Sequence, residues 1–305
     1  MNEVQANEYI VRVNKVCDYI DRHLTEDMTL GGLACVAGFS EYHFHRIFTA
    51  MTGETLFAFI QRLRIERAAI RLCAHPSQKI TQLALECGFT SSAVFCRAFQ
   101  KRFGCAPSAY RDRNKSQRDS SLYQLLRNSG KESSTLDGYN GRKNRRFAMK
   151  PEVTIERMDK TRIAYIRYVG PYAGDAKLFE GLFGRLCAWA GPRGVDMGTT
   201  YIVYHDALGV TDEQKLRLDV CVPIAGNVAV SGEVCETVLD GGTYAVGHFV
   251  LGTDEYSAAW AYMYSDWLPG SGYRPADAVS FERYGGSCGE DGRMPVDICV
   301  PVEAI

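Results

Sequence analysis

The sequence predicts a multidomain protein in which an all-α front half, built of two helix-turn-helix units, precedes an α+β back half built of two β-β-α-β-β repeats. The first observation is a phrase that occurs twice, as GFSEYHFHRIF from Gly38 and as GFTSSAVFCRAF from Gly88. The second is a near match between RLDVCVPI at 217–224 and PVDICVPV at 295–302. The third is a change of apolar period, from helical before residue 111 to short β-like runs after residue 153.

The front half reads as a series of helices with recognisable ends. Val13, Val16 and Ile20 recur at helical spacing and predict an amphipathic first helix. Glycines end the short helices that follow, and Ser40 is a good N-cap for the helix after the first turn. His75-Pro76 stops a longer helix. The predicted ranges after the first helix are about 29–37, 41–51, 56–74, 80–87 and 91–103.

Each repeated phrase has an apolar and a polar helix face. Because positions i and i+4 share a side of a helix, two sets of residues are expected in the core: Phe44, Ile47, Phe48 and Met51, and Phe95, Ala98, Phe99 and Phe103. Each opposite face carries one Arg, Arg46 or Arg97, and Arg is able to donate two hydrogen bonds to guanine in the major groove. The long helix between them is about 28 Å from end to end, near the ~34 Å between successive major-groove segments. One chain is therefore expected to read two grooves as a monomer; the alternative is a bundle whose arginines are merely solvated.

Residues 7–111 resemble the DNA-binding domain of AraC/XylS-family transcription regulators. The resemblance rests on ECGF at 86–89, FCRAFQKRFG at 95–104 and APSAYR at 106–111, and on LACVAGFSEYHFHRIF at 33–48. It implies seven helices, with double-stranded promoter DNA and RNA polymerase as partners. The base contacts that it implies come from Tyr42, His45, Arg46, Ser92, Ala93 and Arg97. Because Ala93 and Cys96 are poor hydrogen-bonding residues, base reading by the second helix is expected to depend mainly on Arg97.

Residues 112–150 are predicted to form a polar linker between the two halves. The segment is rich in Ser, Gly and basic residues and lacks apolar periodicity, apart from LYQLL at 122–126, which suits a short helix. Its basic run, RKNRR at 142–146, either contacts DNA phosphates or is solvated. The predicted domains are therefore 1–111, the linker 112–150, and 151–305.

The two halves also differ in charge. Residues 1–113 carry 14 Lys and Arg against 11 Asp and Glu, and residues 114–150 carry nine against three. Residues 151–305 carry 12 against 22, a net charge of −10. A basic front and an acidic back predict a polyanion as the partner of the first and a cation as the partner of the second.

The back half repeats itself at an offset of 78 residues. The offset pairs Asp219 with Asp297, Trp189 with Trp267, and Tyr204 with Glu282. In the predicted strand 279–284, Ser280, Glu282 and Tyr284 share one face. A carboxylate there, among aromatic side chains, is an attractive site for a cation. The alternative is that Glu282 is one surface acid among the 22 of this half.

Residues 151–305 resemble the GyrI-like effector-binding domain of multidrug regulators. The matching pieces are YIRYVGPY at 165–172, WLPGSGYRPAD at 267–277, FERYG at 281–285 and VDICVPV at 296–302. The resemblance implies two similar halves around a pseudo-twofold axis, with a cleft in which a buried Glu, here Glu282, meets a small cationic or aromatic effector. The other residues expected to line it are Tyr168, Tyr204, Phe249, Trp260 and Tyr284. Two alternatives stay open: a hydrolase that uses Glu282 with Tyr204, and a regulator that binds no ligand.

Composition argues against several other classes of protein. Eleven Cys without a Cys-x-x-Cys pair do not suit a disulfide framework or a zinc site, and His43 and His45 have no further metal ligands nearby in the sequence. No apolar run reaches the ~18 residues of a membrane span, and the polar, acidic start of the chain does not resemble a secretory signal. No catalytic triad or phosphate-binding motif occurs. The expectation is a cytoplasmic bacterial regulator without membrane contact, metal, cofactor or enzymatic activity.

Overall fold

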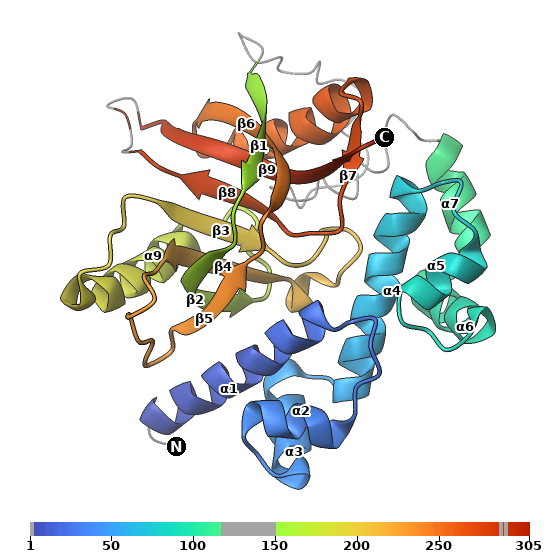
Figure 1. Ribbon diagram of the computed structural model, residues 1–305, viewed down its shortest axis with the longest axis horizontal. Coiled ribbons are helices and arrows are strands. Elements are labelled where there is room, and N and C mark those ends of the chain that lie inside the picture. Colours follow the sequence, from blue (N-terminus) through green and yellow to red (C-terminus); the bar gives the residue numbers. More distant parts are fainter. Residues whose placement is uncertain (1–2, 117–150, 287–288, 290–291) are drawn as a thin grey trace. The chain divides into compact units, whose positions relative to one another are not determined.

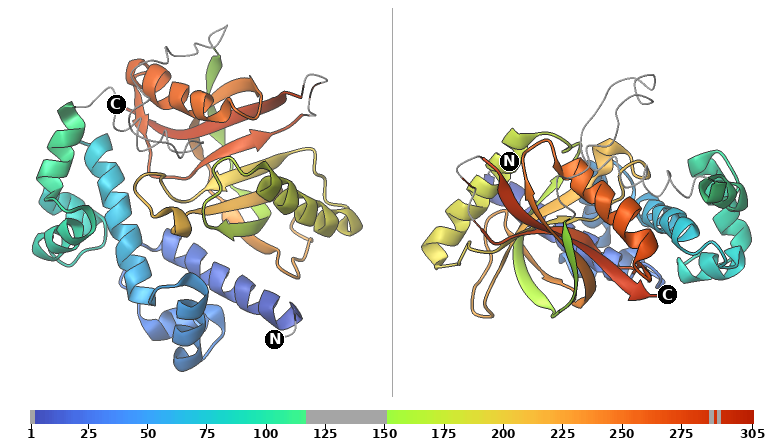
Figure 2. Two further views of the ribbon diagram at one scale, coloured as in Figure 1. Left: turned by 180° about the vertical axis from the view of Figure 1, so that it is seen from behind. Right: turned by 90° about the horizontal axis from the view of Figure 1, so that it is seen from above.

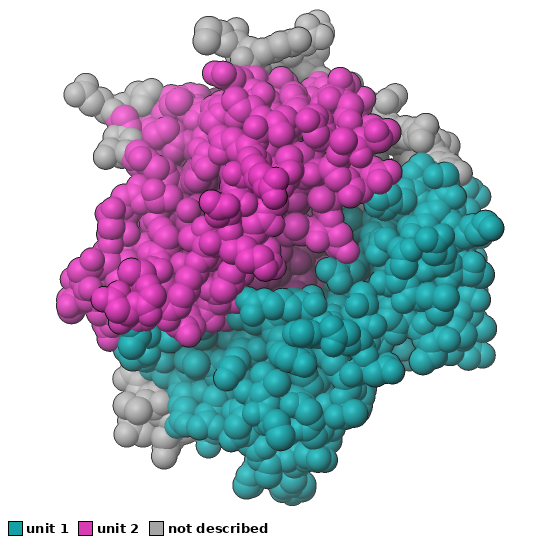
Figure 3. Space-filling model, in the orientation of Figure 1, with its two compact units in different colours: residues 1–122, 229–235 teal, residues 123–228, 236–305 magenta. Residues whose placement is uncertain are grey.

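The computed structural model describes residues 3–116, 151–286, 289 and 292–305. The chain divides into two compact units, one of residues 1–122 with 229–235 and the other of residues 123–228 with 236–305 (Figure 3). The short helix expected at 122–126 and the basic run at 142–146 lie outside the described residues. No helix within the described ranges is long and apolar enough to cross a membrane.

The described part of the first unit contains seven helices (Figure 1). They are α1 (Glu3–Arg22), α2 (Leu30–Ala37), α3 (Glu41–Thr52), α4 (Leu56–Ala74), α5 (Ile80–Glu86), α6 (Ser92–Phe103) and α7 (Pro107–Ser116). The bounds follow the predicted ranges because the capping residues set them. The Ser40 hydroxyl accepts from the backbone N–H of His43 at 3.5 Å, and the Ser91 hydroxyl accepts from that of Val94 at 3.3 Å. Gly53 and Gly104 then end α3 and α6 in the left-handed conformation.

The duplicated segment is larger than the repeated phrase, because it includes the helix before each helix-turn-helix pair. Arg12 of α1 donates through Nη1 to the carbonyls of Ala37 and Gly38, at 3.1 and 2.8 Å. Arg64 of α4 lies in the same way against the second turn, where a Cβ added to Gly88 would come 2.8 Å from its Nε. Thus α1-α2-α3 and α4-α5-α6 are equivalent, and an arginine packs against each turn glycine. The long helix α4 is both the connector between the two repeats and the first helix of the second repeat, α4-α5-α6.

Phenylalanine side chains fill the core of each helix-turn-helix unit. Phe44 and Phe48 are fully buried in α3, and Phe48 packs edge-on against Phe59 of α4 with ring centroids 5.3 Å apart. Phe95 and Phe99 take the same positions in α6, with centroids 5.4 Å apart. The repeated Phe spacing therefore marks the buried face, as predicted from the helical period.

Met51 departs from the prediction that placed it in the core. Its side chain is 42% exposed, although its helical spacing puts it on the side of Phe44 and Phe48. Met51 lies in the last turn of α3, which extends past the buried cluster before Gly53 redirects the chain. Ile47, expected with it, is partly buried against that cluster.

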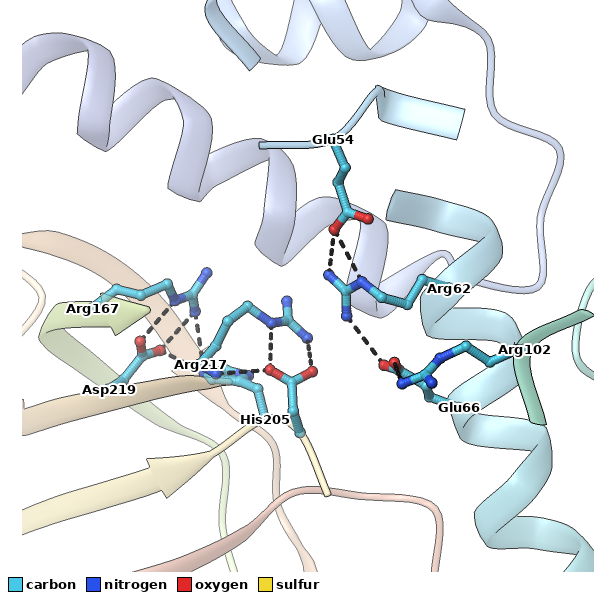
Figure 4. A network of polar contacts seen from close by, with 9 residues as sticks. Glu54, Arg62, Glu66, Arg102, Arg167, His205, Arg217 and Asp219 are labelled. Atoms are coloured by element: carbon cyan, nitrogen blue, oxygen red, sulfur yellow. Dashed lines mark hydrogen bonds and ion pairs between the residues drawn. The ribbon is translucent and has the colours of Figure 1, made fainter. Parts of the chain in front are cut away.

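An ionic network joins the two helix-turn-helix units through α4 (Figure 4). Arg62 of α4 donates to Glu54, which lies between α3 and α4, at 2.7 and 3.0 Å. It also donates to Glu66, one turn further along α4, at 3.1 Å. Glu66 in turn lies 3.6 Å from Arg102 of α6. Because the side chains of Glu54, Arg62 and Glu66 are no more than 10% exposed, this is a largely buried connection between the two helix-turn-helix units.

The second unit is a sheet with two main helices. Its strands are β1 (Glu152–Met158), β2 (Thr161–Val169), β3 (Thr200–Tyr204), β4 (Arg217–Pro223), β5 (Cys235–Leu239), β6 (Gly242–Leu251), β7 (Tyr273–Pro275), β8 (Ser280–Tyr284) and β9 (Met294–Ala304). Its helices are α9 (Ala176–Ala190) and α10 (Tyr256–Ala261), the latter continued by a π-helix, η3 (Tyr262–Trp267). Short 3₁₀ turns are η1 (Gly191–Arg193), η2 (Glu213–Lys215) and η4 (Leu268–Gly270). Both α9 and α10 cover the same face of the sheet (Figure 2, left).

The strand order, β1-β6-β9-β8-β3-β4-β2-β5, is symmetric about its centre. The predicted repeats correspond to β1-β2-α9-β3-β4 and β5-β6-α10-β8-β9, with β7 as a short addition, so the predicted fold class is confirmed. At the centre Val203 of β3 lies opposite Phe281 of β8, its own equivalent at the 78-residue offset. A pseudo-twofold axis therefore passes between these two residues. The first strands are exchanged, since β1 pairs with β6 and β5 pairs with β2.

The face of the sheet opposite the helices carries one ion-pair cluster in each repeat. Asp219 accepts two hydrogen bonds of 2.7 Å from Arg167 and lies 2.6 Å from Nε2 of His205 (Figure 4). Although burial raises the pKa of Asp219, Arg167 and His205 hold it well below its usual range. The second cluster repeats the arrangement with Arg and His interchanged, around Asp297 with Arg283 at 2.9 Å and His248 at 2.7 Å. The clusters join neighbouring strands at equivalent positions and so stabilise the register.

Candidate functional site

Three of the predicted DNA-contacting residues project from the exposed side of α3. Tyr42, His45 and Arg46 are all exposed. Arg46 donates through Nη1 to the Tyr42 hydroxyl at 2.9 Å, and its guanidinium carbon lies 5.6 Å from the centre of the Tyr42 ring. The two residues are one helical turn apart, so the ring supports the charged group along the helix surface. This pair presents a guanidinium in a defined orientation.

The equivalent surface of α6 has no aromatic side chain beside its arginine. Arg97 takes the position of Arg46 and is exposed, but Ala93 stands where α3 has Tyr42. Ser92, at the first helical position, is half-buried next to the capping Ser91. Lys101 and Arg102 add positive charge in the last turn. The two helices therefore differ in what they offer, with an aromatic-supported arginine on α3 and an unsupported one on α6.

Glu282 lies on β8, near the pseudo-twofold axis and on the face that the helices cover. It is 2% exposed. Its carboxylate accepts from the Trp260 indole N–H at 2.7 Å, from the Tyr284 hydroxyl at 2.7 Å and from the Tyr204 hydroxyl at 3.0 Å. Burial raises the pKa of Glu282 above its ordinary value, and the three donors offset part of that rise. The structure thus brings together four of the six residues predicted to form the effector site.

Register explains why these groups meet. Tyr204 lies opposite Ser280, and Ile202 lies opposite Glu282, so Tyr204 and Glu282 point to the same face from adjacent strands. Tyr284 is two residues beyond Glu282 on β8 and shares that face. Trp260 comes from α10 above it. The Tyr204 and Trp260 rings meet edge-on at 5.8 Å, which closes one side of the carboxylate.

The other two predicted residues, Tyr168 and Phe249, share the face but lie further out in the sheet. Tyr168 lies opposite Leu218 of β4, which in turn lies opposite Tyr204, and its hydroxyl donates to the carbonyl of Pro171 at 3.2 Å. Phe249 of β6 is buried in the cluster beneath α10 and η3. These positions suit outer walls of a site around Glu282, and their role stays a prediction.

Two aromatic residues near Glu282 were not predicted. Phe183 of α9 packs edge-on against Tyr284 at a centroid distance of 6.4 Å. Tyr172, in the loop after β2, lies 5.6 Å from the ring centre of Tyr204. Phe183 belongs to an ordinary apolar helix face, whereas Tyr172 ends the phrase YVGPY, and a loop residue has no period from which its orientation follows.

Trp260 reaches Glu282 from the end of α10, just before the helix changes pitch. After Ala261 the helix widens into the π-helix η3, while the equivalent α9 is a continuous α-helix over Ala176–Ala190. The rings of Trp260 and Tyr264 stack at 6.2 Å, and the Tyr264 hydroxyl hydrogen-bonds with that of Ser280 at 3.0 Å. π-Helical turns occur frequently at functional sites. The helix above Glu282 is thus the more specialised of the two.

Family comparisons define the class of protein first. Residues 33–113 match the profile of a helix-turn-helix domain, and residues 151–303 match that of the GyrI-like small molecule binding domain. The match to the second profile covers half of the chain. The chain belongs to the GyrI-like family and carries an AraC-type helix-turn-helix domain in front of it, as the sequence resemblance predicted. The chain thus combines a helix-turn-helix domain with a small molecule binding domain.

Individual relatives match one half or the other. An uncharacterized HTH-type transcriptional regulator of Staphylococcus aureus (strain COL) is 39% identical over 100 residues, which are 33% of this chain and 13% of that protein. The chain thus spans about an eighth of the length of this relative. A protein of Serratia proteamaculans (strain 568) named DNA gyrase inhibitor is 30% identical over 150 residues, 48% of this chain and 94% of its own length.

Solved structures are similar to the same two halves. The DNA-binding domain of AdpA, in complex with a target DNA, is 27% identical and covers 36% of this chain and 97% of its own, with a TM-score of 0.34. The C-terminal domain of EcmrR is 16% identical and covers 52% of this chain and all of its own, with a TM-score of 0.43.

Proposed function

We propose that this regulator reads a promoter site with α3 and α6 of one chain, and that a small organic cation bound at Glu282 controls it. The DNA is double-stranded and one copy binds each site. The domains that divide this work are residues 1–111 and 151–305, joined by 112–150. RNA polymerase is the further partner expected of a regulator at a promoter.

The proposed base-reading residues lie on the two exposed helix faces. On α3 they are Tyr42, His45 and Arg46, and on α6 they are Ser92, Ala93 and Arg97. The α4 connector has 19 residues, or roughly 28 Å, which suits two helices that enter successive major-groove segments. Because Arg46 is held by Tyr42 whereas Arg97 has no such aromatic neighbour one turn before it, the first helix is expected to supply most of the sequence preference.

The observation that carries the effector proposal is the kind of partner that Glu282 has. Its three hydrogen-bond donors, Trp260, Tyr204 and Tyr284, are all neutral. Two other acidic side chains of this unit that are only 2% exposed, Asp206 and Asp219, each form an ion pair with an arginine. A buried carboxylate without a counter-charge is costly, and a bound cation would supply the missing charge. Aromatic rings around it add cation–π attraction, and Tyr168 and Phe249 would extend that wall.

A thermal-shift screen with cationic amphiphiles, followed by calorimetry of the wild-type protein and Glu282→Gln, tests this proposal. Gln keeps the shape and one oxygen acceptor, so the variant is expected to fold. Loss of the charge should weaken binding of a cation about 30-fold or more, because removing one partner of a buried charge pair costs on the order of 2–5 kcal/mol. Glu303→Gln is the matched control, since it removes the same charge from an exposed ion pair with Arg274. Equal affinity in wild type and Glu282→Gln would reject the site.

One observation favours hydrolysis as a second candidate activity. Tyr204 and Glu282 are equivalent across the repeat and are in hydrogen-bond contact at 3.0 Å. A carboxyl group with a raised pKa is suited to general acid–base catalysis. Turnover of a panel of small esters and epoxides that disappears in Glu282→Gln would establish it, and binding without turnover in the wild type would leave sensing as the function.

A further inference from the structure

Tyr172 is a buried phenol beside the Glu282 site. The residue is 2% exposed, and its hydroxyl has no hydrogen-bond partner among the described residues. Its ring centre lies 5.6 Å from that of Tyr204, whose hydroxyl in turn donates to Glu282. A buried polar group without a partner loses the hydrogen bonds that it made to water. A hydroxyl in this position therefore calls for a specific reason.

The loop that carries Tyr172 is tightly fixed. Gly170 has φ +140°, and a Cβ there would lie 2.9 Å from the Tyr168 hydroxyl oxygen. That hydroxyl donates to the carbonyl of Pro171, and the Tyr172 carbonyl accepts from the backbone N–H of Asp175 at 3.2 Å. These contacts hold the backbone on both sides of Tyr172.

The acids nearest to Tyr172 are already engaged. Burial raises the pKa of Tyr172, and the charges of Asp206 and Glu282 raise it further, which keeps the phenol neutral. Asp206 accepts from the side chain of Arg217 at 2.9 and 2.8 Å and from its backbone N–H at 2.8 Å. Glu282 accepts from its three aromatic donors. The Tyr172 hydroxyl is thus a donor that its protein neighbours leave unused.

The number of hydrogen-bond acceptor positions left on Glu282 also limits which ligand can bind there. A carboxylate offers about four acceptor positions, and Trp260, Tyr204 and Tyr284 take three of them. One further N–H donor fits without displacing a neighbour. A primary ammonium group would bring three N–H donors into a buried site and leave at least one without an acceptor. A tertiary ammonium group brings one.

We propose that Tyr172 is a second polar contact of the effector, and that the effector is a tertiary amine that also carries an oxygen acceptor. The ammonium group pairs with Glu282, and the Tyr172 hydroxyl donates to the oxygen. This inference rests on the proposed function, since it assumes a cation at Glu282. It adds the second recognition point and the class of amine.

Three probes of one skeleton test the inference in calorimetric titrations of the full chain. They are 4-(dimethylamino)-1-phenylbutan-1-one, N,N-dimethyl-4-phenylbutan-1-amine, which lacks only the ketone oxygen, and 4-phenylbutan-1-amine, which is the primary amine. The wild-type protein should bind the ketone about three- to tenfold more tightly than the deoxygenated amine, the usual effect of one net hydrogen bond. The primary amine should bind most weakly.

Tyr172→Phe is the discriminating variant, because it removes one oxygen that has no partner in the described protein. Its melting temperature should be equal to or above that of the wild type, and its affinity for the deoxygenated amine should be unchanged. Only the advantage of the ketone should disappear.

Each result decides a separate point. A ketone advantage that persists in Tyr172→Phe, or one absent from the wild type, would overturn the role of Tyr172 while the Glu282 site stands. A primary amine that binds as tightly as its dimethyl counterpart would overturn the assignment to tertiary amines. If none of the three probes binds, the inference fails, while the cation site still has its own test in the wider screen. If Glu282→Gln binds them as well as the wild type does, the proposed cation site at Glu282 fails together with the inference.

Discussion

The buried network of Glu54, Arg62, Glu66 and Arg102 makes Glu66→Gln an informative substitution. Glu66 is 4% exposed, accepts from Arg62 at 3.1 Å and lies 3.6 Å from Arg102. Gln keeps the size and one acceptor but removes the charge that faces two arginines. Removing one partner of a fully buried pair costs about 3–5 kcal/mol. Here Arg62 retains Glu54, and Arg102 is 36% exposed and can be hydrated.

The expected loss is therefore nearer that of one charged hydrogen bond, about 1.5–3 kcal/mol of the free energy of unfolding. Urea denaturation followed by circular dichroism at 222 nm measures it in the helical part of the signal. Glu8→Gln is the control, because Glu8 pairs with Arg12 on the exposed surface and is expected to cost at most about 0.5 kcal/mol.

The same substitution should also affect DNA binding in a specific way. Since Glu66 and Arg102 connect α4 to α6, a weaker network gives the second reading helix more freedom relative to the first. Affinity for a full site, selected from random duplexes, should fall, while affinity for a site cut down to the α3 half should be unchanged. A Glu66→Gln protein that has the same urea midpoint as the wild type and binds the full site equally well would refute the reasoning.

The remaining predictions concern single groups. Arg46→Ala and Arg97→Ala should each weaken binding to the selected site by about 1–3 kcal/mol, with the larger loss of base preference in Arg46→Ala, as gel-shift competition with mutated sites will reveal. Gly88→Ala should destabilise the fold by about 1–3 kcal/mol in urea, because φ is +81° and the added Cβ would meet the backbone carbonyl of Leu24 at 2.9 Å; an unchanged midpoint would contradict it. Burial raises the folded-state pKa of Glu282 above its ordinary 4.5, so between these two pKa values the native state binds more protons and stability falls as pH rises. The melting-temperature gain of Glu282→Gln over the wild type should thus grow from pH 4 upward, whereas a gain independent of pH would show that its cause is not ionisation.

Local signals predicted the helices of this protein well. Ser40 and Gly53 bound α3 through capping chemistry, which depends on the few residues around each end. Met51 was misplaced because burial in the last turn of a helix depends on which neighbour covers it. The π-helix after Ala261 was not predicted, since the apolar pattern of the sequence does not distinguish it from an α-helix.

The candidate site was predictable to the extent that strand alternation and the repeat determine it. Alternation put Glu282 and Tyr284 on one face, and the repeat put Tyr204 beside them. Tyr172 was not predicted as a site residue because its position depends on the turn at Gly170. Only the three-dimensional structure shows that its hydroxyl has no partner among the described residues. The exchange of first strands was equally hidden, because hydrogen-bond partners so distant in sequence leave no local pattern.

That exchange has a consequence for synthesis of the protein. When β1 leaves the ribosome, the strand that it pairs with is still to be made, because Glu152 lies opposite His248. The nascent first repeat therefore has an open edge and waits for the second before its sheet can close. Contacts between residues so far apart in sequence slow folding, and an unpaired edge invites pairing with another chain. A ribosome paused after β4 would thus hold a sheet of β3, β4 and β2 whose two edges are completed only by β8 and β5, and an unpaired β1 whose complement is β6, of its own chain or of a neighbour.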